Sequence, residues 1–117
     1  MSTATTIYHN PRCSKSRQTL ALLEENGIHP NIVEYLNEPP DTATLENLLQ
    51  MLNLTPRELM RTKESVYAEL NLDDPALSDA DLVAAMQANP ILIERPIVVQ
   101  GDRAVIGRPP ENVLALV

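Results

Sequence analysis

The chain has 117 residues, of which 16 are acidic and nine are basic, so its formal net charge is −7. This length predicts one domain that can bury a hydrophobic core without disulfides or metals. The negative charge argues against nucleic acid and against an anionic membrane surface as partners. The single cysteine excludes an internal disulfide, and no apolar run reaches the roughly 18 residues of a membrane helix. We expect a cytoplasmic protein, and we expect a monomer.

The first 36 residues predict a strand, a helix and a second strand. Thr5–His9 is typical of a strand, and Asn10-Pro11 ends it. A helical pattern follows Cys13 and stops at Asn26-Gly27. We expect this helix to turn one side inward, formed by Leu20, Ala21 and Leu23. Asn31–Leu36 predicts the next strand, so the order is that of a βαβ unit with a parallel strand pair.

The middle of the chain predicts a block of helices. One helix begins near Thr42 and carries a stripe of leucines three and four residues apart, which we expect in the core: Leu45, Leu48, Leu49 and Leu52. Thr55–Glu58 has the composition of a capping box. Ser65–Leu70 predicts a short helix, and Ser78 is a candidate cap for the last one, which ends at Asn89-Pro90.

The last third of the chain predicts two strands and a short helix. Pro96–Val99 and Arg103–Ile106 are typical of strands, and Gln100–Asp102 of the tight turn of an antiparallel hairpin. Glu111–Val117 predicts a closing helix. This order is that of an α/β protein with a thioredoxin-like fold, a four-stranded mixed sheet and a helical insertion at about 40–90.

The segment His9–Arg17 lies between the first expected strand and the first expected helix, where ligands collect in open α/β sheets. Cys13 begins this helix, and the unpaired N–H groups and the helix dipole there favour a thiolate. Three cationic side chains close in sequence are expected to lower its pKa further: Arg12, Lys15 and Arg17. A lone cysteine can also be a small buried hydrophobic residue. The polar and cationic flanks favour the reactive role.

Two neighbours of Cys13 are candidates to tune its thiol. Ser16 gives the motif C-x-x-S, so the chain lacks a second thiol and any disulfide must form with an external partner. The Ser16 hydroxyl could hydrogen-bond to the thiolate, or Ser16 could be an ordinary residue of a first helical turn. His9 could tune the thiol from the strand end, or it could be a structural histidine bonded to the backbone.

An acidic chain can bind an anion only through a local cluster of cations. Seven of the nine basic residues are arginines, whose forked donors suit oxyanions. Arg61, Arg95 and Arg108 are the candidates, and Arg95 precedes Pro96 in a possible cis peptide at a strand entry. The sequence has no glycine-rich phosphate loop and no His/Cys set with metal-ligand spacing. We therefore expect no bound cofactor and no metal.

The motif I-Y-H-N-P-x-C at residues 7–13 resembles that of the glutaredoxin-dependent arsenate reductases. The likeness extends over nearly the whole chain, through Ser16-Arg17, Tyr35-Leu36, Pro39-Pro40, Arg57–Arg61, Asn89–Ile93, Arg95–Val99 and Gly107–Pro109. The combination is far more specific than any of its pieces.

The resemblance implies an arsenate reductase of thioredoxin-like fold. In the family, the cysteine matching Cys13 attacks arsenate, glutathione attacks the adduct as co-substrate, and glutaredoxin resolves the mixed species before arsenite leaves. The three oxyanion-binding arginines fall on Arg61, Arg95 and Arg108, and the Arg-Pro bond matching Arg95-Pro96 is cis. The positions of His9 and Ser16 are associated with stabilising the thiolate.

The chain differs from the classical enzymes at Ser14-Lys15, where they carry Gly-Thr, and they continue well beyond the position of Val117. It is most similar to a shorter, arsenate-reductase-like branch. Two other functions are compatible with the residues. One is a redox-sensitive regulator that binds a protein such as RNA polymerase, although those relatives usually carry C-x-x-C. The other is a general glutathione-linked thiol protein without arsenate activity.

Overall fold

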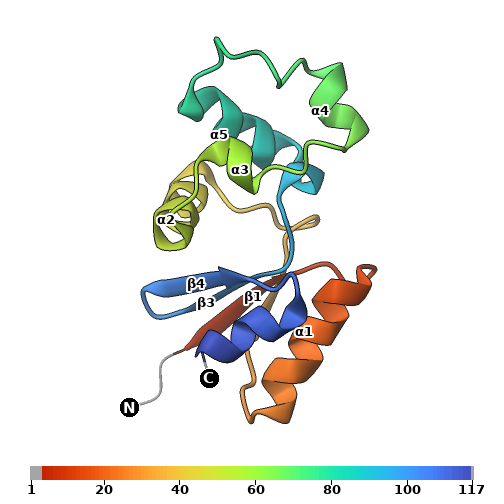
Figure 1. The fold of residues 1–117 in the computed structure, drawn as a ribbon, viewed down its shortest axis with the longest axis vertical. Helices are drawn as coiled ribbons and strands as arrows, with labels where there is room; N and C mark the ends of the chain where they lie inside the picture. Colours follow the sequence, from red (N-terminus) through yellow and green to blue (C-terminus); the bar gives the residue numbers. More distant parts are fainter. Residues whose placement is uncertain (1–3, 117) are drawn as a thin grey trace. The chain divides into compact units, whose positions relative to one another are not determined.

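A computed structural model describes residues 4–116 of the chain (Figure 1). The chain divides into two compact units. The first unit consists of the residues up to Glu38 and those from Arg95 onward, and the second of Pro39–Glu94. The first contains a four-stranded sheet and the second a group of helices.

The sheet has the strand order β2-β1-β3-β4. Its members are β1 (Thr5–His9), β2 (Asn31–Glu34), β3 (Ile97–Gln100) and β4 (Arg103–Ile106). β1 pairs in parallel with β2 and antiparallel with β3, which pairs antiparallel with β4. The predicted mixed four-stranded sheet and its thioredoxin-like element order are confirmed.

Pairing with β1 determines where β2 ends, and a glycine turn joins β3 to β4. β2 stops at Glu34 because that residue pairs with His9, the last residue of β1. The strand predicted over Asn31–Leu36 is therefore two residues too long. β3 and β4 are joined at Gly101, whose φ of +63° is a conformation that glycine adopts without strain. The predicted hairpin is confirmed.

The core of the first unit lies between the sheet and two helices. α1 (Ser14–Glu25) and the 3₁₀ helix η2 (Pro110–Leu116) lie together against one face of the sheet (Figure 1). The buried side chains of this core are Ile7, Leu23, Val98, Val113 and Leu116. The inward side of α1 includes Ser16 and Thr19, whereas Ala21 is exposed, so its predicted place on that side is wrong. The closing helix is 3₁₀ and starts one residue earlier than predicted; Val117 lies outside the described residues.

The second unit contains α2 (Thr42–Leu52), α3 (Pro56–Leu59), α4 (Ser65–Glu69), α5 (Asp79–Ala88) and the 3₁₀ helix η1 (Pro90–Leu92). Thr55 with Glu58, and Ser78 with Asp81, form the reciprocal hydrogen bonds of two capping boxes. Both caps are those that the sequence predicts. Of the leucine stripe in α2, all but Leu52 are buried. Within residues 4–116, no helix is long and apolar enough to cross a membrane.

Two extended segments of the second unit run side by side. Met60, after α3, forms an antiparallel bridge with Ile93, after η1. The Arg61 N–H donates to the Leu92 carbonyl oxygen at 2.7 Å, and the Glu94 N–H donates to the Leu59 carbonyl oxygen at 2.9 Å. This pairing fixes the backbone of Arg61 next to that of Glu94.

Candidate active site

The loop between β1 and α1 holds Cys13 at the N-cap position of α1. The Cys13 N–H donates to the Asn10 carbonyl oxygen at 3.0 Å, and the Arg12 N–H donates to Asn10 Oδ1 at 3.0 Å. The Arg17 guanidinium donates to the Pro11 carbonyl oxygen at 2.9 Å. These three bonds close the loop on itself, so the half-buried Cys13 thiol is carried on a fixed backbone.

The surroundings of Cys13 favour its thiolate. Burial raises the pKa of the Cys13 thiol, but the main-chain N–H of Ser16, the Arg95 guanidinium and the main-chain N–H of Lys15 together bring that pKa below its ordinary value. The sulfur does not cap α1 with a hydrogen bond of normal geometry, so the two N–H groups act mainly by electrostatic attraction at the positive end of the helix. A thiolate, and not a thiol, is the nucleophilic form of cysteine.

The side-chain cation that acts on Cys13 is Arg95, far away in sequence. Its guanidinium interacts with the thiol and with Tyr35, a tyrosine only 1% exposed, and these interactions raise the pKa of Arg95 although burial lowers it. The cationic side chains of Arg12, Lys15 and Arg17 are not among the groups that lower the pKa of Cys13. The prediction that neighbours in sequence supply the positive charge is therefore wrong. The positive charge comes instead from Arg95, which lies just before β3.

Ser16 and His9 form a buried pair behind the loop. His9 Nδ1 lies 2.6 Å from Ser16 Oγ, and the same hydroxyl oxygen accepts the Asn10 N–H at 3.1 Å. The Ser16 side chain is thus engaged away from the thiol, and its main-chain N–H is the group that acts on Cys13. Burial lowers the pKa of His9, while Glu34 raises it and Arg17 lowers it further. A neutral His9 at neutral pH follows, which fits a residue that supports the loop from inside.

Arg108 follows β4 on the same unit as Cys13. Gly107 precedes it and lies so close to α1 that a Cβ atom there would be 2.5 Å from Thr19 Oγ1. Thr19 Oγ1 in turn donates to the Lys15 and Gly107 carbonyl oxygens, at 2.8 and 3.2 Å. The absence of a side chain at Gly107 therefore lets the end of β4 approach the first turns of α1. The Arg95-Pro96 peptide bond is cis, as expected, and Arg108-Pro109 is also cis, which the sequence reasoning missed.

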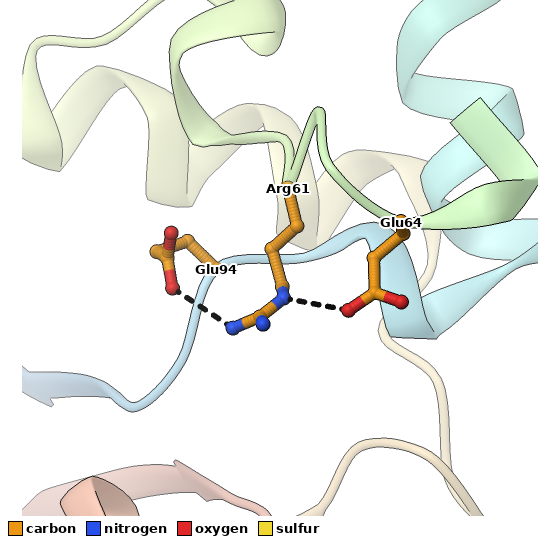
Figure 2. A network of polar contacts seen from close by, with 3 residues as sticks. All are labelled: Arg61, Glu64 and Glu94. Carbon is orange, nitrogen blue, oxygen red and sulfur yellow. Dashed lines mark hydrogen bonds and ion pairs between the residues drawn. The ribbon is translucent and has the colours of Figure 1, made fainter. Parts of the chain in front are cut away.

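Arg61 belongs to the second unit, where two glutamates hold it (Figure 2). Arg61 Nε lies 3.1 Å from Glu64 Oε1, and Nη1 lies 3.3 Å from Glu94 Oε1. Neither glutamate was singled out from the sequence, because the i,i+3 spacing of Arg61 and Glu64 is common and Glu94 is brought in only by the Met60–Ile93 bridge. Arg61 is thus a cation that is already paired.

A cavity of about 430 Å³ adjoins the Cys13 loop, and no motif in the sequence predicts it. It is lined by the loop and by the segment around the end of β2: His9, Asn10, Pro11, Arg12, Glu34, Leu36 and Asn37. Among residues 4–116 there is no group of three or more His, Cys, Asp or Glu side chains that could hold a metal ion. The Cys13 thiol and the Arg95 guanidinium that acts on it are the reactive pair of this unit.

Comparisons with known proteins place the chain in a family. A model of the ArsC family matches residues 8–116. The uncharacterized protein YfgD of Escherichia coli (strain K12) is 60% identical over 112 residues, which are 95% of this chain and 94% of that protein. A protein of Haemophilus influenzae named arsenate reductase is 51% identical over 111 residues, covering 94% of this chain and 96% of its own.

Solved structures agree with these relatives. The structure of an arsenate reductase from Vibrio cholerae matches with a TM-score of 0.96 and 52% identity over all of both chains. That structure shares the sheet and helices described above, and the match extends through the second unit. The family resemblance that the motif at residues 7–13 indicates is confirmed, and the chain belongs to the ArsC family.

Proposed function

We propose that the chain reduces arsenate to arsenite, with the Cys13 thiolate as nucleophile. The observation that carries the proposal is the lowered pKa of Cys13 beside the Arg95 guanidinium. A thiolate attacks an electrophilic centre, and a guanidinium binds an oxyanion through two parallel hydrogen bonds. The relatives from Haemophilus influenzae and Vibrio cholerae that cover nearly all of this chain are named arsenate reductases, which supports arsenate as the oxyanion.

The first step is a substitution at arsenic without a change of oxidation state. The Cys13 sulfur forms a bond to As(V), and one arsenate oxygen leaves as water after protonation. Negative charge on the remaining oxygens is stabilised by Arg95 and, in the proposed site, by Arg61 and Arg108. The family resemblance supports the last two residues, since they match the arginines of the family's oxyanion site.

The following steps supply the two electrons from external thiols. A glutathione thiolate bonds to the same arsenic and a second water leaves. A glutaredoxin thiolate then attacks the glutathione sulfur, a disulfide forms between them, and the electron pair of the broken S–As bond reduces As(V) to As(III). Hydrolysis of the Cys13–As bond releases arsenite and restores the thiol. External donors are required because Cys13 is the single cysteine of the chain, so no internal disulfide can form.

A thiol of this kind would work in a reducing compartment that holds glutathione, so we place the reaction in the cytoplasm. We assign the reaction to a monomer.

A second candidate function is glutathione-linked thiol exchange without arsenate. The same lowered pKa of Cys13 favours it, because a reactive thiolate can attack the disulfide of any accessible partner. A protein-binding regulator has no such observation in its favour.

The electron donors are tested by an assay with each of them omitted. NADPH consumption is followed with arsenate, glutathione, glutaredoxin and glutathione reductase, and then without glutathione, without glutaredoxin, or with thioredoxin and its reductase instead. We expect consumption only with the complete glutathione and glutaredoxin set. Equal rates with thioredoxin would reject the proposed donors, while consumption without arsenate would favour general thiol exchange.

A further inference from the structure

The cavity beside the Cys13 loop is formed by the first unit alone, because every residue that lines it belongs to that unit. Its volume of about 430 Å³ lies within the range of roughly 300–1,000 Å³ that is usual for small-molecule sites. The cavity lies where β1 and β2 end, since their last residues, His9 and Glu34, pair in parallel and both line it. The carboxyl ends of parallel strands are where α/β proteins bind their ligands.

Two of the lining residues, Arg12 and Glu34, carry opposite charges on exposed side chains. Within residues 4–116, neither side chain forms a hydrogen bond or an ion pair. Their backbones are nevertheless held in place. The Arg12 N–H donates to Asn10 Oδ1 at 3.0 Å, and Glu34 pairs with His9 in the sheet. The cavity therefore presents one positive and one negative group on an ordered backbone.

A pair of opposite charges in one cavity selects for a particular kind of ligand. A simple anion would be attracted by Arg12 and repelled by Glu34, and a neutral apolar molecule would remove water from both charges without replacing it. An α-amino acid group carries a carboxylate and an ammonium together, so it can satisfy both. A guanidinium binds a carboxylate through two parallel hydrogen bonds, and a carboxylate accepts hydrogen bonds from an ammonium. The charges of the cavity thus fit a zwitterion.

The position of the cavity fits a ligand that reacts at Cys13. Arg12 directly precedes Cys13, so their Cα atoms are about 3.8 Å apart, whereas an extended tripeptide spans roughly 10 Å. A small peptide bound through an amino acid group at Arg12 is therefore long enough to reach the Cys13 sulfur. Pro11 and Leu36 add apolar surface for the methylene groups of such a peptide. Arg12 has no other assigned role, because it is not among the groups that lower the pKa of Cys13.

We propose that this cavity binds the γ-glutamyl group of glutathione, with Arg12 at its α-carboxylate and Glu34 at its ammonium group. The inference rests on the proposed function, which names glutathione as the thiol co-substrate. Bound in this way, glutathione directs its thiol toward the arsenic atom that is bonded to the Cys13 sulfur. The cavity orients the step already described, in which an S–As bond forms and water leaves, and it requires no further reactant.

The binding test uses S-methylglutathione, whose blocked thiol cannot react, in an NMR chemical-shift titration of the full chain. Arg12→Gln and Glu34→Gln each remove one charge from the cavity. We expect each variant to bind S-methylglutathione roughly three- to fivefold more weakly than the wild type, toward the upper end of the scale of exposed ion pairs. Lys63→Gln and Glu24→Gln are the matched controls, because they remove exposed charges that do not line the cavity, and they should bind as the wild type does.

Altered ligands show which group each residue contacts. N-acetyl-S-methylglutathione lacks the ammonium charge, so Glu34→Gln should bind it as tightly as the wild type does, while Arg12→Gln should still bind it more weakly. S-methylcysteinylglycine lacks the whole γ-glutamyl group, so both variants should bind it like the wild type. Each comparison is a double-mutant cycle between a side chain and a ligand group. In the arsenate assay, both variants should raise KM for glutathione by a similar factor without changing KM for arsenate.

Equal affinities of the wild type and both variants for S-methylglutathione would overturn the inference, as would no binding by the wild type at millimolar concentrations. A raised KM for glutaredoxin with an unchanged KM for glutathione would also overturn it and assign the cavity to the protein partner. The titration does not depend on turnover. Binding with the expected losses but no arsenate reduction would therefore reject the proposed function alone, whereas turnover with the same KM for glutathione in every form would reject the inference alone.

Discussion

Cys13 owes its lowered pKa to groups from separate parts of the chain. The main-chain N–H groups of Lys15 and Ser16 come from the first turn of α1, and the Arg95 guanidinium comes from the residue that precedes the cis bond to Pro96. Burial works against them by favouring the neutral thiol. The reactive form therefore depends on the guanidinium staying near the sulfur.

Replacing Arg95 tests this dependence. In Arg95→Ala the pKa of Cys13 should rise, so alkylation by iodoacetamide at pH 6–7 should slow, while the rate at high pH, where the thiol is ionised in both proteins, should be similar. Arg95→Lys should lie between them, since it keeps the charge without the fork. The pH profile of the alkylation rate measures this. Lys63→Ala is the control, because Lys63 is exposed and is not among the groups that act on the Cys13 thiol. Equal profiles of Arg95→Ala and Lys63→Ala would contradict the assignment.

Arg95 should matter to turnover as well as to the thiol. Its removal takes away a hydrogen-bond donor to the oxyanion in the proposed reaction. We expect Arg95→Ala to lose about 2 kcal/mol or more of transition-state stabilisation, the scale of oxyanion-donor removals. The measurement is kcat/KM for arsenate at a pH where Cys13 is fully ionised in both proteins. A kcat/KM within twofold of the wild-type value would show that Arg95 does not bind the oxyanion.

His9 should make the stability of the protein depend on pH. Burial lowers its pKa in the folded state below the ordinary value of 6.5, so the unfolded chain takes up a proton at higher pH than the folded chain. The contribution of His9 to stability is then present above pH 6.5 and is lost as the pH falls below it. Urea unfolding at pH 7 and pH 5 should show a smaller loss for His9→Gln than for the wild type. His29→Gln, at an exposed histidine, should behave as the wild type does; an equal effect of both variants would contradict the assignment.

The approach of β4 to α1 depends on Gly107. A Cβ atom there would lie 2.5 Å from Thr19 Oγ1 and 3.0 Å from the Pro96 side chain. We expect Gly107→Ala to reduce the free energy of unfolding by about 1–3 kcal/mol, as other overpacked sites do. Adding Thr19→Ala should recover part of the loss, because it removes the atom that the new methyl group meets. Urea unfolding of the single and double variants tests this, and a Gly107→Ala protein as stable as the wild type would show that the contact yields without strain.

The capping box of α5 should contribute measurably to the second unit. Ser78 accepts the Asp81 N–H at 3.1 Å, and Asp81 accepts the Ser78 N–H at 3.0 Å. Ser78→Ala should cost about 1 kcal/mol of unfolding free energy, whereas Ser78→Thr should cost little because its hydroxyl can take the same role. Thermal or urea unfolding distinguishes the two variants. Equal stability of Ser78→Ala and Ser78→Thr would mean that the hydroxyl bond adds nothing to stability.

At the level of elements, local patterns predicted most of the fold. The start of α2 and the caps at Thr55 and Ser78 follow from residues next to one another in sequence, and the structure confirms them. β2 and η2 were predicted less well, because the length of β2 depends on where β1 ends. The exposure of Ala21 likewise depends on where the sheet and η2 lie against α1. Sequence neighbours carry no information about such partners.

At the scale of the whole molecule, the candidate site likewise combines a local feature that the sequence predicts with long-range contacts that it does not predict. Cys13 was identified from its position between a strand and a helix, which is a local signal. Its contact with Arg95 and the pairing of Arg61 with Glu94 join segments far apart in sequence, and only the fold creates them. The family resemblance selected Arg95 and Arg61 among seven arginines, but it carried no sign of the two glutamates.

The most direct test of the whole account is arsenic speciation after the protein has been incubated with arsenate, glutathione and glutaredoxin. Arsenite is separated from arsenate by chromatography and quantified by mass spectrometry, for the wild type and for Cys13→Ser. The account predicts many arsenite molecules formed per wild-type protein and only the background of the thiols alone with Cys13→Ser. Arsenite at the background level with the wild type, while Cys13 is still alkylated rapidly near neutral pH, would contradict it and leave a reactive thiolate with a different substrate.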